Sequence, residues 1–415
     1  LFENSTGSSN TAVGANALYN NTTASFNTAI GESAAYATTV GDRNVAVGYE
    51  SLKTNILGDR NTALGFGALF TMNPSGNADT LNTAVGYAAM YYTTTGTENT
   101  GLGSYALQAN TTGSYNTAVG EQALTSNTTA SSNTAVGRLA LQSTTTGSNN
   151  TGLGFQALRY ATTAYSNVAV GTNAMNATTT GANNVAVGYN SLTANTTGHT
   201  CVAIGDAALK TNTTGESNTA VGYNALEFNE TADFNTAVGY KSLEANTTGQ
   251  YNTAVGTNAS IANTTGERNT AVGMNTLEAN TTGSENTALG QGALNDNTTA
   301  SYNTAVGRSA LAVNTTGFNH VAVGYEALKA NTTSNSNTAI GWKALTANTT
   351  GGSNTAVGGS ALITNTTGDY NVAVGEQALN SNTTSDSNTA VGNAALKTNS
   401  TGTINVAVGT NALWS

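Results

Sequence analysis

The sequence predicts an all-β fold, a β-solenoid of 24 coils with a 17-residue repeat, and three observations support this. The glycine of an Asn-Thr-Ala-Val-Gly phrase recurs every 17 residues from Gly14 to Gly409, except for one interval of 21 between Gly65 and Gly86. Only 8% of the residues are charged and one is proline, whereas ordinary soluble domains carry about 25% and about 5%. Asn, Thr, Gly and β-branched residues dominate, which favours short strands closed by tight turns.

We number each coil from the asparagine of this phrase, so that residues 218–234 span positions 1 to 17 of a typical coil. Positions 1–4 predict a strand, and the glycine at position 5 ends it. Positions 8 and 9, usually Ala-Leu, predict a second short strand, and Asn-Thr-Thr-Gly at positions 12–15 predicts the return corner. One coil cannot bury its own apolar face, so the core forms only when coils stack. At about 4.8 Å per coil, the array predicts a rod on the order of 115 Å long.

Comparison of the 24 copies shows which positions are restricted. Position 5 is glycine in every copy, which predicts a positive φ or a close backbone approach. Position 9 is leucine in 20 copies and is the predicted core. Position 15 is glycine in most copies but alanine or serine in others, which predicts a tight turn rather than a left-handed one. Asparagine fills position 1 in 22 copies and position 12 in most, which predicts two ladders of stacked amides.

Positions 3 and 4 predict how chains associate. Position 4 is always Val, Ile or Leu, and we expect it to point into the coil. Position 3 is always Ala or Gly and would then point outward, because neighbouring strand residues face opposite sides. The resulting strip of small residues, on the order of 1,100 Å², exceeds what soluble monomers usually expose. We therefore expect self-association as a parallel homotrimer along this strip; the alternative is a monomeric solenoid in which alanine fills a crowded interior.

The phrases Asn44–Gly48 and Asn371–Gly375, followed in most copies by Ala-Leu and a second glycine corner, resemble the head repeat of YadA-like trimeric autotransporter adhesins. Similar arrays form the shafts of phage tail fibres. The resemblance covers nearly the whole chain and implies a left-handed β-roll packed as a trimer. The adhesin head repeat is typically shorter than 17 residues, so the cross-section of this solenoid is expected to differ.

The rare reactive residues do not predict catalysis. Cys201 and His320 both stand at position 1, seven coils apart, and His199 lies in a variable corner. None of them has the neighbouring base that activates a nucleophile. Carboxylates such as Asp206 and Glu376 stand singly at variable position 6, and no Asp-rich metal motif recurs. We expect no enzyme activity, no cofactor and no metal.

Charge and hydropathy exclude two classes of partner. The net charge is −10, and no cluster of Lys and Arg marks a nucleic-acid footprint. No apolar run approaches the roughly 20 residues of a membrane helix, so no membrane insertion is expected within this segment.

Three surface features are candidates for binding. Position 6 carries exposed aromatic residues that could contact a host surface or a glycan, or could simply cover a turn: Tyr189, Tyr223, Tyr240, Tyr325 and Trp342. The four-residue insertion around 72–81 contains Pro74 and predicts either a binding loop or a plain bulge. The Asn-Thr-Thr corners match the N-glycosylation signal, and a glycosylating secretory route would make a heavily sugared rod.

Residues 1–415 are thus expected to form a single solenoid array that acts as a structural extracellular fibre segment. We expect a rigid shaft of a viral tail fibre or a bacterial surface adhesin, located outside the cell, on its surface or in a virion, which holds a receptor-binding tip away from a surface. The alternatives are a subunit of an extracellular filament and an ice- or carbohydrate-binding solenoid. Adjacent threonines face opposite sides, so each Thr-Thr corner would offer ice only one outward hydroxyl per coil.

Overall fold

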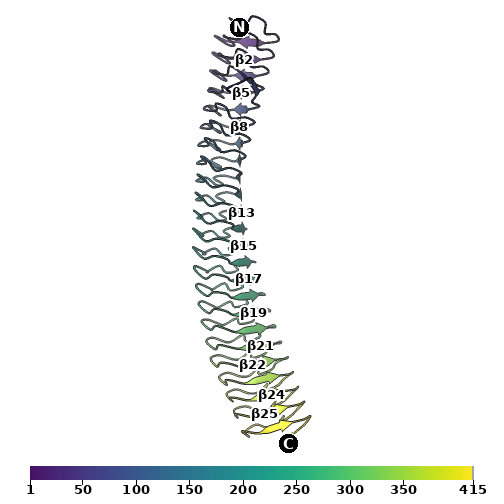
Figure 1. Cartoon of the computed structure of the whole chain (residues 1–415). Helices are drawn as coiled ribbons and strands as arrows, with labels where there is room; N and C mark the ends of the chain where they lie inside the picture. Colours follow the sequence, from purple (N-terminus) through teal and green to yellow (C-terminus); the bar gives the residue numbers. More distant parts are fainter. Residues whose placement is uncertain (414–415) are drawn as a thin grey trace. The chain divides into compact units, whose positions relative to one another are not determined.

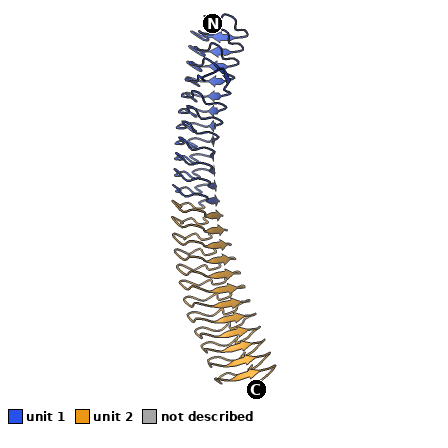
Figure 2. Cartoon of the chain, viewed as in Figure 1, with its two compact units in different colours: residues 1–207 blue, residues 208–415 orange. Residues whose placement is uncertain are grey.

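The structure, a computed structural model, describes residues 1–413 and contains no helix in that range. The chain forms two compact units, Leu1–Ala207 and Ala208–Ser415 (Figure 2). Within each unit the coils lie one above another and their strands form a parallel column (Figure 1). The predicted all-β solenoid, with about 24 coils and a roughly 17-residue repeat, is confirmed in the described residues.

The strands of both columns occupy positions 2–4, and pairing is in register: Thr236 lies opposite Thr253, and Val238 lies opposite Val255. In unit 1 the column contains β1 (Thr11–Val13), β2 (Thr28–Ile30), β3 (Val45–Val47), β5 (Thr62–Leu64), β7 (Thr83–Val85), β8 (Thr100–Leu102), β9 (Thr117–Val119), β10 (Thr134–Val136), β11 (Thr151–Leu153), β12 (Val168–Val170), β13 (Val185–Val187) and β14 (Val202–Ile204). In unit 2 it contains β15 (Thr219–Val221), β16 (Thr236–Val238), β17 (Thr253–Val255), β18 (Thr270–Val272), β19 (Thr287–Leu289), β20 (Thr304–Val306), β21 (Val321–Val323), β22 (Thr338–Ile340), β23 (Thr355–Val357), β24 (Val372–Val374), β25 (Thr389–Val391) and β26 (Val406–Val408).

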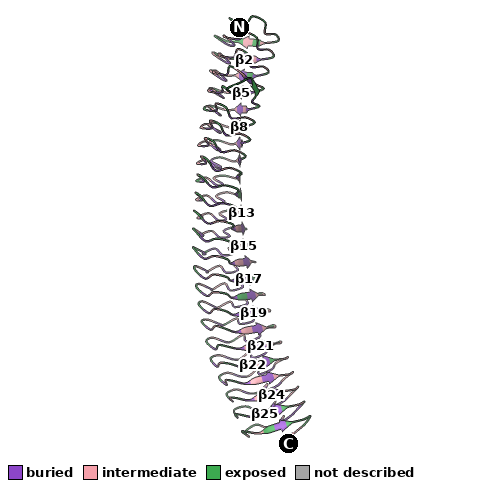
Figure 3. Cartoon of the chain, viewed as in Figure 1, coloured by how far each residue is buried: buried purple, intermediate pink, exposed green. Residues whose placement is uncertain are grey.

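The expected inward direction of position 4 is wrong. Position 3 is buried from Ala29 to Ala407, whereas position 4 is half-buried or exposed, so the strands change burial class along their length (Figure 3). Leu289 at position 4, for example, is 47% exposed. The reason is space, because position 3 packs against the position-9 side chain of the preceding coil. A Cβ on Gly152 would already lie 3.3 Å from Cγ of Leu141. The interior therefore admits only a methyl group or a hydrogen at position 3, and the larger residue at position 4 turns outward.

The second strand expected at positions 8 and 9 is also wrong, because these residues form turns. Positions 7 and 9 both have positive φ, 53° at Asn224 and 52° at Leu226. Their amides still bond along the stack: the Leu226 N–H donates to the Ser242 carbonyl at 3.0 Å. A left-handed conformation costs a leucine about 1–2 kcal/mol. The Leu226 side chain is fully buried, which confirms position 9 as the predicted core. Its burial stabilises the fold by about 1.5–3 kcal/mol and so offsets the conformational cost.

Both glycine predictions are confirmed. At position 5, Gly239 has a φ of 133°, and a Cβ there would lie 2.5 Å from the carbonyl oxygen of Gly256 in the next coil. This position therefore requires glycine for its dihedral and for the close approach of two coils. Position 15, as at Gly249, is not left-handed, which is why alanine and serine also occur there.

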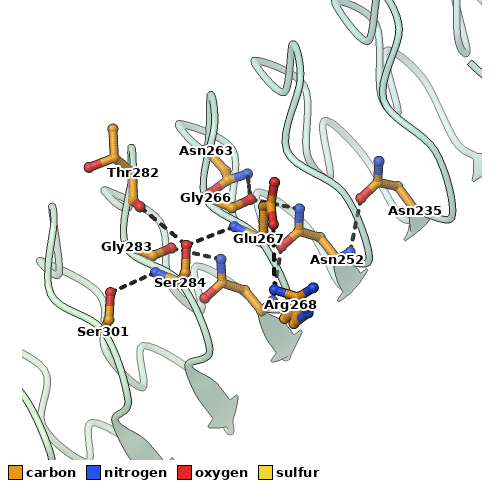
Figure 4. A network of polar contacts seen from close by, with 11 residues as sticks. Asn235, Asn252, Asn263, Gly266, Glu267, Arg268, Thr282, Gly283, Ser284 and Ser301 are labelled. Atoms are coloured by element: carbon orange, nitrogen blue, oxygen red, sulfur yellow. Dashed lines mark hydrogen bonds and ion pairs between the residues drawn. The ribbon is translucent and has the colours of Figure 1, made fainter.

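The two predicted asparagine ladders are confirmed, and Figure 4 shows how they meet. At position 1, the Asn252 backbone N–H donates to Oδ1 of Asn235 at 2.9 Å, and its Nδ2 donates to the Gly266 carbonyl at 2.8 Å. At position 12, Asn263 Nδ2 donates to the same Gly266 carbonyl at 3.0 Å and to Oδ1 of Asn246 at 2.9 Å. One corner carbonyl thus joins both ladders, and buried amides are satisfied from coil to coil.

A third ladder at position 16 was not predicted. The Glu267 N–H donates to Oγ of Ser284 at 3.0 Å, and the Ser284 N–H donates to Oγ of Ser301 at 3.0 Å (Figure 4). Aspartate serves equally, since the Asp369 N–H donates to Oδ1 of Asp386. The available signal was the frequency of short acceptor side chains at this variable position.

The position-12 ladder differs between the units. In unit 2 asparagine fills the position in every coil from Asn212 to Asn399, but unit 1 interrupts the run with threonine, methionine and alanine. Where Thr38 follows Asn21, the Asn21 Oδ1 and the Thr38 Oγ1 are buried and have no hydrogen-bond partner. This break, like the one at Thr144 beside Asn127, therefore leaves polar atoms that the intact ladder would satisfy.

The insertion around 72–81 lies in unit 1 and adds a small parallel pair outside the main column, β4 (Gly58–Asp59) with β6 (Ala78–Asp79). Its buried Thr80 bonds to the position-1 ladder, accepting from Asn61 Nδ2 at 2.6 Å. An ion pair between Arg60 and Asp79 lies on its exposed side. The inserted residues are therefore bonded to the main solenoid through Arg60 and Asn61.

Candidate functional site

The five aromatic residues selected from the sequence all lie on the outer surface, directly after the position-5 glycine. Their exposed fractions range from 38% at Tyr325 to 55% at Tyr189 and Trp342. Tyr189 belongs to unit 1, and Tyr223, Tyr240, Tyr325 and Trp342 belong to unit 2.

Tyr223 and Tyr240 stand in adjacent coils and stack, with ring centroids 5.5 Å apart and an interplanar angle of 11°. The Lys241 ammonium lies 5.8 Å from the Tyr240 centroid. Stacked rings cover one another's faces and present their edges to solvent. This pair therefore offers a ridge with phenol hydroxyls rather than two free platforms for sugars.

Tyr325 and Trp342 form a second group with charged neighbours. Lys343 Nζ lies 5.0 Å from the Trp342 ring and 6.0 Å from the Tyr325 ring. It also pairs with Glu326, which in turn accepts a hydrogen bond from Lys329 at 2.8 Å. These cations hold the pKa of Glu326 below its ordinary value. The group combines aromatic surface with donors and acceptors, a mixture that suits a polar ligand.

Unit 1 contains a longer aromatic column at position 6, whose members are not among the five selected residues. Tyr49, Phe66 and Tyr87 stack at 5.2 and 5.1 Å, and Tyr105, at position 7 of the next coil, contacts Tyr87 edge-on at 5.3 Å. The signal was available in the sequence, because aromatic residues at one position of consecutive coils must meet at the stacking distance.

The most uniform exposed feature is the outer face of the strand column. Positions 2 and 4 point outward, and they carry only Thr or Val and only Val, Ile or Leu in all 24 copies. No copy places a charge there, although exposed positions such as 6 and 17 vary between coils and carry charges in several of them. We name this surface the β face. In β17, for example, Val255 is exposed beside half-buried Thr253, while Ala254 between them is buried.

The Thr-Thr corner presents one outward residue per coil, as predicted. Thr264 at position 13 is half-buried, and its hydroxyl donates to the Thr281 carbonyl at 3.0 Å. Thr265 at position 14 is exposed. The first hydroxyl is therefore committed to joining the coils.

His320 takes the place of asparagine in the position-1 ladder and is buried. Its Nδ1 accepts from the Asn337 N–H at 3.1 Å, and its Nε2 lies 2.7 Å from the Ser334 carbonyl. This pairing requires the neutral ring with the proton on Nε2. Burial lowers its pKa from 6.5 to about 4, against the opposing effect of the two backbone hydrogen bonds. His320 thus continues the ladder as a neutral residue.

Cys201 is buried at position 1 and free of any disulfide. Its backbone N–H donates to Oδ1 of Asn184 at 2.8 Å, in the pattern of an asparagine. Nδ1 of His199 accepts from the Ala182 N–H at 2.9 Å, which places it in the position-16 ladder. All three rare residues occupy ladder positions.

Among residues 1–413, no group of three or more His, Cys, Asp or Glu side chains is arranged to hold a metal ion. The same part of the chain contains no helix with the length and hydropathy to span a membrane. No protein-family model matches the sequence, and no curated protein matches it.

Proposed function

We propose that this chain is a structural extracellular fibre segment, a shaft of a viral tail fibre or a bacterial surface adhesin that holds a receptor-binding tip away from a surface. The observation that supports it is the repetition of one bonding pattern through each unit. Strand pairs and side-chain ladders join every coil to the next, as at Asn235, Asn252 and Asn269, and no step needs a ligand. Such an array resists local opening, because each coil is held by both neighbours.

Deletion of whole coils tests the shaft. Removing residues 218–285 takes out four coils in register, and we expect a folded particle about 19 Å shorter in electron micrographs. The matched control removes residues 218–277, which leaves residues 278–285 as an incomplete coil and breaks the ladders at that junction. We expect proteases to cleave the control at the junction. Equal damage by both deletions would refute a shaft built from interchangeable coils.

We further propose that the shaft is a parallel homotrimer of left-handed β-rolls, with the β face as the surface that joins the chains. The outward position-3 strip that first suggested self-association does not exist; the β face is instead an outward uncharged strip, with Val, Ile or Leu in one row and Thr or Val in the other. Its two rows span roughly 10 Å, and the twelve coils of unit 2 extend it over roughly 600 Å². That area approaches the roughly 800 Å² per partner of a stable interface.

Sedimentation velocity tests this association. Lysines at Val238 and Val255 place two charges on the β face of adjacent coils, and we expect the trimer to dissociate while the circular dichroism stays unchanged. The control places the same charges at exposed Thr248 and Thr265, outside that face, and should remain trimeric. A monomeric parent chain would refute the trimer, and a trimeric V238K/V255K variant would refute the interface.

A further inference from the structure

The glycosylation signals at position 12 of unit 2 point inward. In unit 2 each position-12 asparagine begins an Asn-x-Ser/Thr sequence, and those from Asn212 to Asn382 are fully buried. Glycan transfer forms a bond between Nδ2 and the anomeric carbon of a sugar donor, with loss of one amide proton and departure of the phosphate leaving group. The acceptor amide must therefore reach solvent and give up one N–H.

The amides at position 12 meet neither condition. Asn246 Nδ2 donates both hydrogens, to Oδ1 of Asn229 at 2.9 Å and to the Gly249 carbonyl at 3.0 Å. The surrounding corner is tightly packed, although it accepts a methyl group in some coils, as buried Ala232 shows at position 15. A single Cβ on Gly249 would lie 2.7 Å from Oδ1 of Asn246 and 3.1 Å from Nδ2 of Asn263. A sugar ring, which is far larger than a methyl group, cannot occupy this corner without opening the coil.

One signal in unit 1 has the opposite setting. Asn149 stands at position 17 and begins the sequence Asn149-Asn150-Thr151. Its side chain is exposed, whereas the neighbouring Asn150 is buried in the position-1 ladder and donates to Oδ1 of Asn133 and to the Ala164 carbonyl. The same chain thus carries an exposed acceptor as an internal comparison for the buried ones.

We propose that N-glycosylation at position 12 and folding of the solenoid are mutually exclusive. A sugar attached before folding removes one ladder bond and blocks the corner, and a folded coil gives a transferase no access. The chain is consequently suited to fold where no N-glycan transfer precedes folding, as in a bacterial cytosol, and not in a secretory compartment that glycosylates nascent chains. This inference stands independently of the proposed fibre function.

The test uses a soluble N-glucosyltransferase that acts on Asn-x-Ser/Thr, with UDP-glucose as donor and peptide mass mapping as readout. The folded full-length chain is compared with its own tryptic peptides, in which residues 242–268 carry Asn246 without a fold. We expect glucose on Asn246 in the peptide, and at least about a hundredfold slower transfer in the folded chain, because reaction there requires local opening. Asn149 should react in the folded chain.

Comparable rates at Asn246 in chain and peptide would overturn the proposal, and an unreactive Asn149 would overturn its assignment as an accessible acceptor. A second arm expresses the chain together with the transferase, so that transfer competes with folding. Molecules with glucose at position 12 should occur only in the insoluble or protease-sensitive fraction. Their recovery in a soluble, protease-resistant fraction with the parent circular dichroism spectrum would equally overturn the exclusion.

Discussion

Replacement of Asn263 by threonine tests how much one rung of the position-12 ladder contributes. The change removes three hydrogen bonds: those from Asn263 Nδ2 to Asn246 Oδ1 and to the Gly266 carbonyl, and that from Asn280 Nδ2 to Asn263 Oδ1. Threonine fits the site sterically, because unit 1 carries it at the same position, as at Thr144.

The expected cost follows from these bonds. Each contributes about 1 kcal/mol net, and the Asn246 Oδ1 left buried without a donor adds about 1–3 kcal/mol. Small adjustments of neighbouring side chains offset part of this sum, so we expect a loss of about 3 kcal/mol. The natural break at Thr144 shows the same consequence, since Asn127 Oδ1 beside it has no partner.

Native-state hydrogen exchange is the appropriate assay, because repeat arrays open locally and do not unfold in one step. The amides of Ser260 and Leu277, which bond to the next coil, should exchange about a hundredfold faster in Asn263→Thr. Replacement of the exposed Thr265 by asparagine is the control and should leave both rates unchanged. An increase of less than about threefold at both amides would refute a stabilising ladder.

Three further predictions concern other positions. Gly239→Ala should lower the melting temperature strongly, because its φ of 133° and the next coil exclude a Cβ. Gly359→Ala should not, because a Cβ there would meet only Glu376 Cγ, at an ordinary contact distance of 4.0 Å. Thr38→Asn should raise the stability of unit 1 by about 1–2 kcal/mol in hydrogen exchange, since it supplies the donor that Asn21 Oδ1 lacks; no gain would contradict this. The pKa of His320 is about 4 in the fold and 6.5 as its ordinary value, so the unfolded chain takes up the proton first. The contribution of His320 to the free energy of unfolding should be fully present above pH 6.5. It should decrease by about 3 kcal/mol as the pH drops from 6.5 to 4, and the free energy of unfolding should then stay constant below pH 4. His320→Asn should abolish this dependence, and an unchanged profile in that variant would exclude His320 as its source.

The features that could be predicted from the sequence are those in which a position of the coil admits nearly one residue type. Leucine at position 9, glycine at position 5 and the two asparagine ranks are buried or close to another coil, so repetition alone revealed them. The directions of positions 3 and 4 could not be predicted, because both positions are apolar. Residue type alone does not tell which of the two points into the narrow interior of the coil. The interior is too narrow for valine, because even a Cβ on Gly152 would lie 3.3 Å from Cγ of Leu141.

The remaining misses have separate physical causes. Leucine rarely adopts a positive φ, so propensity predicts a strand at Ala225-Leu226 and not the left-handed Leu226 of the structure. The position-16 ladder was overlooked because Ser284 and Asp386 share a role, as hydrogen-bond acceptors, but not a residue type. The selected aromatic residues lie on the surface, but whether Trp342 or Tyr325 contacts a ligand depends on a partner that residues of this chain do not encode.

The asparagine ladders also give each solenoid unit a direction. In both ranks the later coil donates and the earlier coil accepts, as Asn252 does with Asn235 and Asn263 with Asn246. A folded coil with asparagine at positions 1 and 12 therefore presents two amide oxygens that accept hydrogen bonds from the next 17 residues of the chain. Each donor follows its acceptor by only 17 residues in the sequence, so its ordering closes only a short loop and costs little conformational entropy. Each coil is thus a template for its successor, and growth toward the C-terminus follows the order in which a ribosome delivers the chain.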